Sequence, residues 1–209
     1  MRHGVLVRRK IPRMSPSSPA GSSPGLIPTE GVSQKALIHL MAYDPEVCNE
    51  ARMRTSKRLR MSLESGKINW VDIDSIGNRK LIASLAKLFG FHKLALEDVL
   101  NTETRPKVEQ YKDFTYIVAR MMPQARTGFA EQLSIFVKEG HVVTIQQTPG
   151  DPFDLLRQRI RTGAGTVRHM PVGYLAYAIL DLAIDTFFPE LERIAERLRR
   201  HSTTVKMTT

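Results

Sequence analysis

Two apolar stretches separated by a short turn constrain the fold of this chain most. Gln132–Val137 and Val142–Gln147 flank the segment Lys138-Glu139-Gly140-His141. Two strand-like segments joined by a few residues that include glycine are typical of a β-hairpin. The chain is therefore expected to build a sheet, and the remaining segments must pack on it.

The segments around the hairpin alternate between strand and helix patterns. Residues 78–89 have apolar positions at helical spacing and end at Gly90, which is typical of a helix C-terminus. The predicted strands are 36–42, 67–73 with a buried Trp70, 114–119 and the hairpin; the predicted helices are 44–64, 78–89, 92–100, 151–161 (with Asp151-Pro152 as N-cap and first residue), a long one from Pro171, and one from about Pro189 to Arg200. Helices that flank a mixed sheet predict a layered α/β or α+β domain.

The positive charge lies mainly at the two ends of the chain. The net charge is +10 over 209 residues, and residues 1–33 and 193–209 each carry five basic residues against one acid, hence +4 each. The middle is nearly neutral apart from a basic run between Arg52 and Arg60, which is interpreted as a solvated helix or loop. Nucleic acid is therefore not the expected partner, because such binding requires a basic face on the folded part.

The composition also predicts the boundaries and the compartment. We expect a disordered Pro/Ser/Gly-rich lead-in over 1–33, an α/β domain over 34–170, helices over 171–200 and a disordered tail over 201–209. Cys48 has no second cysteine to pair with, which favours a reducing compartment. The apolar stretch from Pro171 is interrupted by Asp181 and Asp185, so the sequence predicts no membrane-spanning segment and a soluble, cytoplasmic chain.

Motifs of the common enzyme classes are missing from the sequence. It has no Walker A sequence, GxGxxG, HExxH or CxxC, and its six histidines lack the spacing of zinc ligands. We therefore expect that the protein is not an enzyme.

Four acidic residues stand in unusually apolar surroundings. Glu97 and Asp98 lie in KLALEDVL, and Asp181 and Asp185 lie four apart in AYAILDLAIDTFF, on one face of a helix. Carboxylates in such surroundings are costly to bury unless they are paired or bound to a metal. Carboxylate oxygens suit Mg²⁺ or Ca²⁺; the alternative is that each acid is solvated or paired with an arginine.

A longer pattern resembles a known family. The segment Leu96-Glu97-Asp98-Val99-Leu100-Asn101, followed by Arg105-Pro106-Lys107-Val108-Glu109, is similar to the LEDxLN…RPKVE block of the CorA family of divalent-cation transporters. Trp70-Val71-Asp72, Gln132–Ile135, DLLRQRIR and YLAYAILDLAIDTFFPEL resemble other segments of the family in the same order. The resemblance covers about residues 36–198.

The resemblance implies a fold and an assembly. In this family a cytosolic α/β/α domain with a mixed parallel and antiparallel sheet ends in the start of a long stalk helix, and five subunits form a pore in the membrane. A Gly-Met-Asn signature marks the pore mouth, and this sequence has neither that tripeptide nor a predicted membrane helix. We therefore expect a chain truncated before the pore, unable to conduct ions alone, whose pentamer depends on the stalk.

The resemblance also implies a regulatory metal site. Asp98 would be the principal ligand, Glu97 would lie beside it and Asp181 would belong to the secondary part of the site, with Asp185 as a further acid. The ion would be Mg²⁺, bound weakly, with Co²⁺ as an alternative, between neighbouring cytosolic domains. Arg105 and Lys107 are expected to pair with acids.

Three functional hypotheses follow. The first is the metal-sensing and gating domain of a CorA-like magnesium or cobalt transporter, with a zinc transporter of the same superfamily as a variant. The second is a stand-alone binding or regulatory protein that docks on anionic membrane or nucleic acid through Arg52–Arg60 and the tails. An enzyme is the third and the least favoured.

Overall fold

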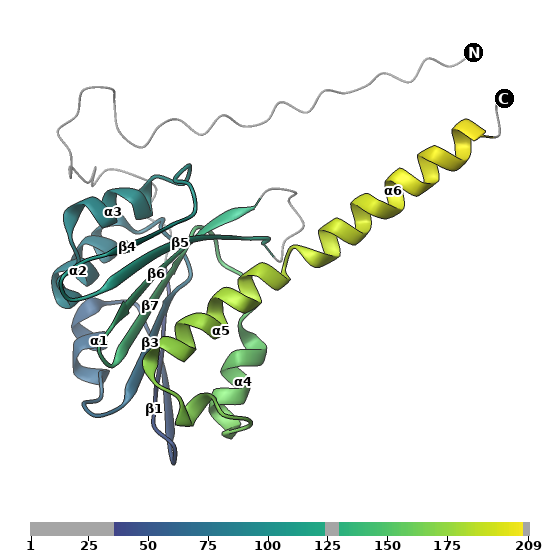
Figure 1. The fold of residues 1–209 in the computed structure, drawn as a ribbon. Coiled ribbons are helices and arrows are strands. Elements are labelled where there is room, and N and C mark those ends of the chain that lie inside the picture. Colours follow the sequence, from purple (N-terminus) through teal and green to yellow (C-terminus); the bar gives the residue numbers. More distant parts are fainter. Residues whose placement is uncertain (1–35, 124–129, 207–209) are drawn as a thin grey trace, which may run out of the picture.

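The computed structural model describes residues 36–123 and 130–206, so the lead-in predicted over 1–33 and residues 207–209 lie outside the described residues. Seven strands form one sheet in the order β2-β1-β3-β7-β6-β5-β4 (Figure 1). The strands are β1 (Ile38–Tyr43), β2 (Cys48–Met53), β3 (Ile68–Ile73), β4 (Lys107–Gln110), β5 (Thr115–Met121), β6 (Glu131–Lys138) and β7 (His141–Gln146). Strands β3 and β7 run parallel and the other neighbours antiparallel, so the predicted mixed sheet is confirmed.

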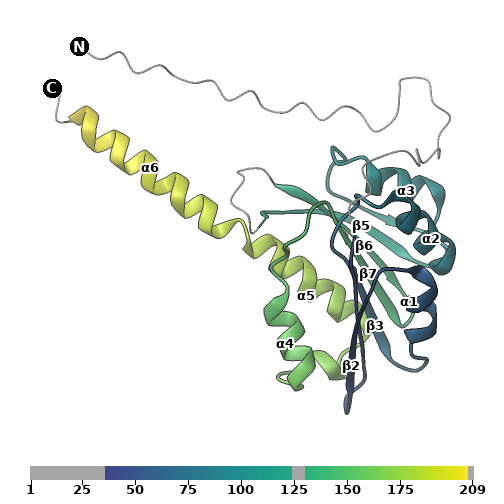
Figure 2. The same ribbon diagram turned by 180° about the vertical axis from the view of Figure 1, so that it is seen from behind.

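Helices cover both faces of this sheet, which confirms the α/β/α layering. On one face lie α1 (Ser56–Ser62), α2 (Arg79–Phe89) and α3 (Lys93–Leu100); on the other lie α4 (Asp154–Thr162), a 3-10 turn (Val167–His169) and α5 (Val172–Asp185). The last helix, α6 (Phe188–Lys206), extends away from the layered domain, as the reverse view shows (Figure 2).

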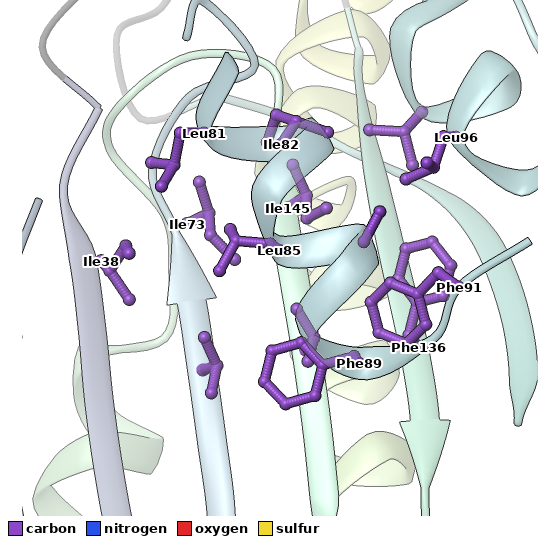
Figure 3. Packing of buried hydrophobic residues seen from close by; sticks show 14 of the residues in the cluster. Ile38, Ile73, Leu81, Ile82, Leu85, Phe89, Phe91, Leu96, Phe136 and Ile145 are labelled. Carbon is purple, nitrogen blue, oxygen red and sulfur yellow. The ribbon is translucent and has the colours of Figure 1, made fainter. Parts of the chain in front are cut away.

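The first hydrophobic core fills the space between the sheet and α1–α3. Because side chains alternate along a strand, Ile38 and Leu40 of β1 face this core while Met41 and Tyr43 face the opposite one. Helix α2 contributes Leu85 and other side chains packed on β3 and β7 (Figure 3). Its ends match the prediction: Asn78 Oδ1 accepts a hydrogen bond from the Leu81 amide, and Gly90 has φ +73°.

The second core lies between the sheet and α4–α5. Trp70 is 1% exposed, as predicted, and its ring meets the Phe153 ring edge-on at 6.0 Å. Leu156 and Ile160 of α4 and the buried face of α5, represented by Ile179, close this core. The central strands are therefore buried on both faces, which explains their nearly continuous apolar sequences.

Two edge strands depart from the sequence-based expectations. The helix predicted over 44–64 is wrong for its first half, where Asp44 Oδ1 accepts hydrogen bonds from the amides of Glu46 and Val47 and turns the chain into β2. The basic run is thus divided between β2 and α1 and does not form one helical face. Strand β4 was not expected at all. Both strands lie at edges and are mostly exposed, so their sequences lack an apolar alternation.

The last three helices begin close to the predicted positions. Helix α4 starts at Asp154, after Phe153, because Asp151 accepts a hydrogen bond from the Phe153 amide without belonging to the helix; the N-cap role predicted for Asp151 is wrong. Helix α5 follows Pro171 as predicted, and α6 continues to Lys206, beyond the expected end at Arg200.

One helical stretch of the described residues is long and apolar enough to cross a membrane. It is Val172–Arg200, with a mean hydropathy of 1.3 and 22% of that window buried. The sequence-based expectation that no segment could span a membrane is therefore wrong as regards length and composition. The core helix of a soluble domain meets the same criterion, and the buried face of α5 is part of the second core, so the stretch alone does not identify a membrane span.

Candidate functional site

Glu97 and Asp98 lie on the half-buried side of α3. The other side of this helix is buried and carries Ala95, Leu96, Val99 and Leu100. Gln132 of β6 donates a hydrogen bond through Nε2 to the main-chain oxygen of Asp98 at 2.7 Å, which ties the end of α3 to the sheet. The chain therefore presents Asp98 from a firmly held helix, with its side chain 24% exposed.

Lys107 of β4 binds the Asp98 carboxylate. Its Nζ lies 2.7 Å from Asp98 Oδ2 and 2.6 Å from Glu109 Oε1, and the Tyr111 hydroxyl donates to Glu109 Oε2 at 3.0 Å. Lys107 and Glu109 are two residues apart on one strand, so their side chains share a face. The expectation that Lys107 pairs with acids is confirmed; Arg105 is exposed and makes no ion pair with any described residue.

The electrostatics of this group favour its charged form. Partial burial would lower the pKa of Lys107, but the hydrogen bonds that its ammonium donates to Asp98 and Glu109 outweigh this effect, and the pKa is raised. The hydrogen bond from Lys107 lowers the pKa of Glu109. Burial, together with Glu109, raises the pKa of Tyr111. The pair of Lys107 and Glu109 is therefore charged at neutral pH.

Asp181 and Asp185 lie on α5, on the other face of the sheet. They are one helical turn apart, as predicted, and both are exposed. Neither makes an ion pair with a described residue. Since α3 and α5 cover opposite faces of the sheet (Figure 1), one chain does not bring Asp98 and Asp181 together.

The predicted ligands therefore form two separate acidic surfaces in one chain. Within 36–123 and 130–206, no three His, Cys, Asp or Glu side chains are grouped so as to hold a metal ion. Each surface offers hard oxygen atoms, the ligands that Mg²⁺ prefers, and Mg²⁺ needs only one or two carboxylates besides its waters. The metal-ligand role of Glu97, Asp98, Asp181 and Asp185 stays a prediction.

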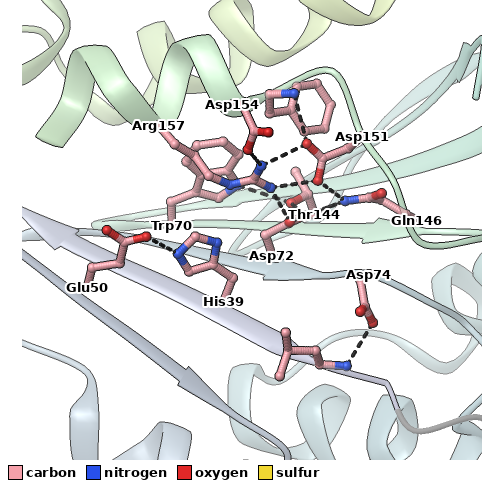
Figure 4. Close-up of polar contacts among 12 residues, drawn as sticks. His39, Glu50, Trp70, Asp72, Asp74, Thr144, Gln146, Asp151, Asp154 and Arg157 are labelled. Carbon is pink, nitrogen blue, oxygen red and sulfur yellow. Dashed lines mark hydrogen bonds and ion pairs between the residues drawn. The ribbon is translucent and has the colours of Figure 1, made fainter. Parts of the chain in front are cut away.

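A buried ion network that sequence reasoning missed lies under α4 (Figure 4). The Arg157 guanidinium places Nη2 2.6 Å from Asp72 Oδ2 and 2.6 Å from Asp151 Oδ2. Thr144 donates to Asp72 Oδ1 at 2.5 Å, and Gln146 Nε2 donates to Asp151 at 2.7 Å. The guanidinium carbon of Arg157 also lies 5.3 Å from the centre of the Trp70 ring. This network joins β3, β7 and α4.

Burial shapes the protonation of this network. Desolvation, and then the charge of Asp151, raise the pKa of Asp72 to about 6 against the opposing pull of Arg157. The hydrogen bond and charge of Arg157 outweigh the effect of burial at Asp151 and lower its pKa. The two carboxylates raise the pKa of Arg157 despite its burial, so it stays charged. The network is a structural clamp with one cation between two buried acids.

A second pair of contacts ties α4 to the sheet edge. Arg161 donates to both carboxylate oxygens of Glu50 on β2 at 2.8 Å, and His39 Nε2 lies 2.5 Å from Glu50 Oε1. The hydrogen bond from Arg161 is the main cause that lowers the pKa of Glu50 to about 2. Burial lowers the pKa of His39, although the hydrogen bond and the charge of Glu50 act to raise it.

One signal in the sequence could have indicated the buried network. Trp70-Val71-Asp72-Ile73 places an acid inside an otherwise apolar strand, and such an acid requires a cation or several hydrogen bonds. The identity of the cation could not be read, because Arg157 lies 85 positions away in the sequence.

Comparisons with known proteins agree with this fold. The sequence profile of the CorA-like Mg2+ transporter proteins matches residues 65–209. The Cobalt/magnesium transport protein CorA of Thermotoga maritima is 30% identical over 186 residues, which are 87% of this chain and 53% of that protein. The Putative metal ion transporter YfjQ of Bacillus subtilis is 30% identical over 139 residues, 65% of this chain and 42% of that protein.

Solved structures show the same architecture. The soluble domain of CorA from Methanocaldococcus jannaschii superposes with a TM-score of 0.62 at 17% identity, covering 81% of this chain and 64% of that chain. The cytoplasmic domain of ZntB from Vibrio parahaemolyticus has a TM-score of 0.61 at 13% identity, covering 80% and 65%. Identities this low establish the fold alone.

The curated relatives are much longer than the region that matches. The chain spans about half of the Thermotoga protein and less of the Bacillus protein. The family consists of transporters and not of enzymes, in agreement with the sequence-based expectation. Since its profile matches well over half of the residues, the chain belongs to the family of CorA-like Mg²⁺ transporter proteins.

Proposed function

We propose that the α/β/α domain of this chain senses divalent cations and gates a CorA-like magnesium or cobalt transporter. The observation that carries the proposal is the separation of the predicted ligands. Glu97 and Asp98 lie on one accessible surface, and Asp181 and Asp185 lie on another, across the sheet. Acids placed in this way can meet around one ion only when two chains lie side by side.

The residues of the domain suit such a shared site. Asp98 comes from a helix whose end is tied to the sheet by Gln132, and Asp181 comes from a helix whose opposite face is part of the second core. A bound divalent cation would supply positive charge between the two acidic surfaces. Without that charge the acids of neighbouring chains repel one another, so the arrangement of the subunits depends on ion concentration.

An exposed apolar stripe supports self-association of the chain. Tyr177, Ile184, Leu191 and Leu198 recur every seven residues along α5 and α6, and Phe188 lies between them. All five are 58–66% exposed. Apolar residues at heptad spacing on exposed helices favour packing against other helices. We infer a homo-oligomer, for which the pentamer expected from the family resemblance is the first candidate.

The proposal also assigns a place in the cell. A sensing domain of this kind lies at the cytoplasmic face of a membrane, where it meets the cation that is transported. Mg²⁺ is the favoured ion because hard oxygen atoms are the only ligands predicted, and Co²⁺ is the alternative. The affinity is expected to be weak, because each chain contributes only part of the first shell.

Mg²⁺ titration of the purified chain tests the proposal. An ion bound only by the folded protein stabilises it by about 1.4 kcal/mol at ten times its dissociation constant. We therefore expect millimolar Mg²⁺ to raise the melting temperature or to promote self-association in sedimentation velocity. Asp98→Ala should abolish both effects.

Asp113→Ala is the matched control. Asp113 is an exposed acid in the turn between β4 and β5, and its loss changes the net charge by the same amount. An unchanged melting temperature and sedimentation coefficient for the wild-type chain across the titration would exclude the sensing function. Equal losses in Asp98→Ala and Asp113→Ala would show only a general charge effect.

A further inference from the structure

The Asp98 carboxylate already has a cation of its own. Lys107 Nζ lies between Asp98 Oδ2 and Glu109 Oε1 at 2.7 and 2.6 Å. The three side chains are 24–37% exposed. The ammonium therefore occupies one of the two oxygens of the residue that is expected to be the principal metal ligand.

The fold holds Lys107 in this position. Residues 107 and 110 of β4 pair with Val118 and Thr115 of β5, which fixes the register of the strand. Glu109 is itself held by the Tyr111 hydroxyl. The turn between α3 and β4 is closed by Arg120, whose Nη2 donates to the Thr104 carbonyl at 2.9 Å. The contact between α3 and β4 is therefore built into the domain.

A divalent cation and the Lys107 ammonium compete for the same oxygen of Asp98. Mg²⁺ binds carboxylate oxygens at about 2.0–2.1 Å, inside the 2.7 Å that separates Lys107 from Oδ2. An ammonium and a divalent ion that close to each other repel strongly where water is partly excluded. The charge of Lys107 therefore opposes binding of a metal ion at this oxygen.

We propose that Lys107 is an internal competitor, which occupies Asp98 in the metal-free domain and must be displaced when a divalent cation binds. This inference rests on the proposed function. It adds that the Asp98 carboxylate is paired with Lys107 in the metal-free state. When the divalent cation leaves, the ammonium of Lys107 takes its place. The competition raises the ion concentration at which the domain responds.

The test compares Mg²⁺ binding by the full chain and by Lys107→Met, using calorimetric titration. Removal of the competing ammonium should tighten binding about fivefold, the size expected for a partly exposed ion pair. Lys112→Met is the matched control, because Lys112 is an exposed residue of the adjacent turn without a described partner; it should bind like the wild type. Lys107→Arg keeps the charge and should also bind weakly.

NMR of the lysine ammonium groups supplies a second readout. In the wild-type chain, the ¹⁵N signal of Lys107 should move toward that of a free ammonium as Mg²⁺ saturates, while other lysine signals stay in place. A structural role of Lys107 alone would not produce this metal-dependent release.

The outcomes separate the inference from the proposed function. Wild-type binding that is unchanged in Lys107→Met, or an unmoved Lys107 signal at saturation, overturns the competitor role and leaves the sensing function intact. Binding seen only in Lys107→Met supports the competitor role and refutes sensing by the natural chain. Absence of binding in both proteins overturns both.

Discussion

Arg157→Met removes the one cation of the buried network and should be among the most damaging substitutions in α4. Its contact with Asp154 adds little, since that side chain is 87% exposed and such pairs are worth at most about 1 kcal/mol. The cost arises at Asp72 and Asp151, whose side chains are 5% and 9% exposed. Breaking a buried pair by removing one partner costs about 3–5 kcal/mol.

We expect a loss of about 4 kcal/mol in the free energy of unfolding, which corresponds to a fall of about 8–16 °C in the melting temperature. Urea unfolding followed by tryptophan fluorescence is a suited assay, because Trp70 is the only tryptophan of the chain and lies beneath Arg157. Arg159→Met, an exposed arginine of the same helix, serves as control and should change stability by less than about 0.5 kcal/mol.

The loss should depend on pH. The pKa of Asp72 is raised to about 6, above that of the unfolded chain. Its contribution to stability is therefore complete in acid and is lost as the pH rises through about 6. Without Arg157 the carboxyl groups of Asp72 and Asp151 become harder to ionise. The loss of folding stability in the variant should therefore be larger at pH 8 than at pH 5. A loss below about 1 kcal/mol, or one equal to that of Arg159→Met, would refute the clamp.

Three further predictions concern other parts of the domain. Gly90→Ala should lower the free energy of unfolding in urea by about 1 kcal/mol, because alanine is strained at a φ of +73°. No atom lies within 4 Å of the added methyl group, so backbone strain is the whole cost. Arg161→Met should lower the free energy of unfolding by about 1 kcal/mol at pH 7. This difference from the wild type should vanish as the pH falls from the unfolded pKa of Glu50 to about 2, where Glu50 becomes protonated. A difference in stability that persists in acid would contradict the pairing of Arg161 with Glu50. Leu191→Ser should weaken self-association in sedimentation experiments without lowering the melting temperature, since Leu191 is 58% exposed; unaltered association would exclude the stripe as the contact.

Much of the fold could be predicted because its signals are local. The hairpin of β6 and β7 and the helix that ends at Gly90 depend on residues that are neighbours in sequence. Strands β2 and β4 escaped prediction for a physical reason. Edge strands bury few side chains, so their sequences need not alternate between apolar and polar residues. The residues of β2 are also those that are common on the exposed surface of a helix.

The candidate site was predictable only in part. Local spacing placed Asp181 and Asp185 on one side of a helix, and the structure agrees. The pairing of Lys107 with an acid was also expected. That this acid is Asp98 could not be predicted, because it depends on how β4 lies beside α3. Which acids from different chains meet is a property of the assembly, and no pattern within one sequence determines it.

The single parallel pair, β3–β7, has a consequence for the order of folding. It divides the sheet into two halves, each continuous in sequence: β1–β3 on one side and β4–β7 on the other. Contacts across the boundary join distant residues, such as Trp70 and Thr144, which are 74 positions apart. Distant contacts close slowly because the intervening loop must be ordered first.

We therefore expect the two halves to form early and to join late, with Arg157 closing over the boundary after both exist. Substitutions in the network should then accelerate unfolding far more than they slow folding. We expect this domain to come apart first along the boundary between β3 and β7.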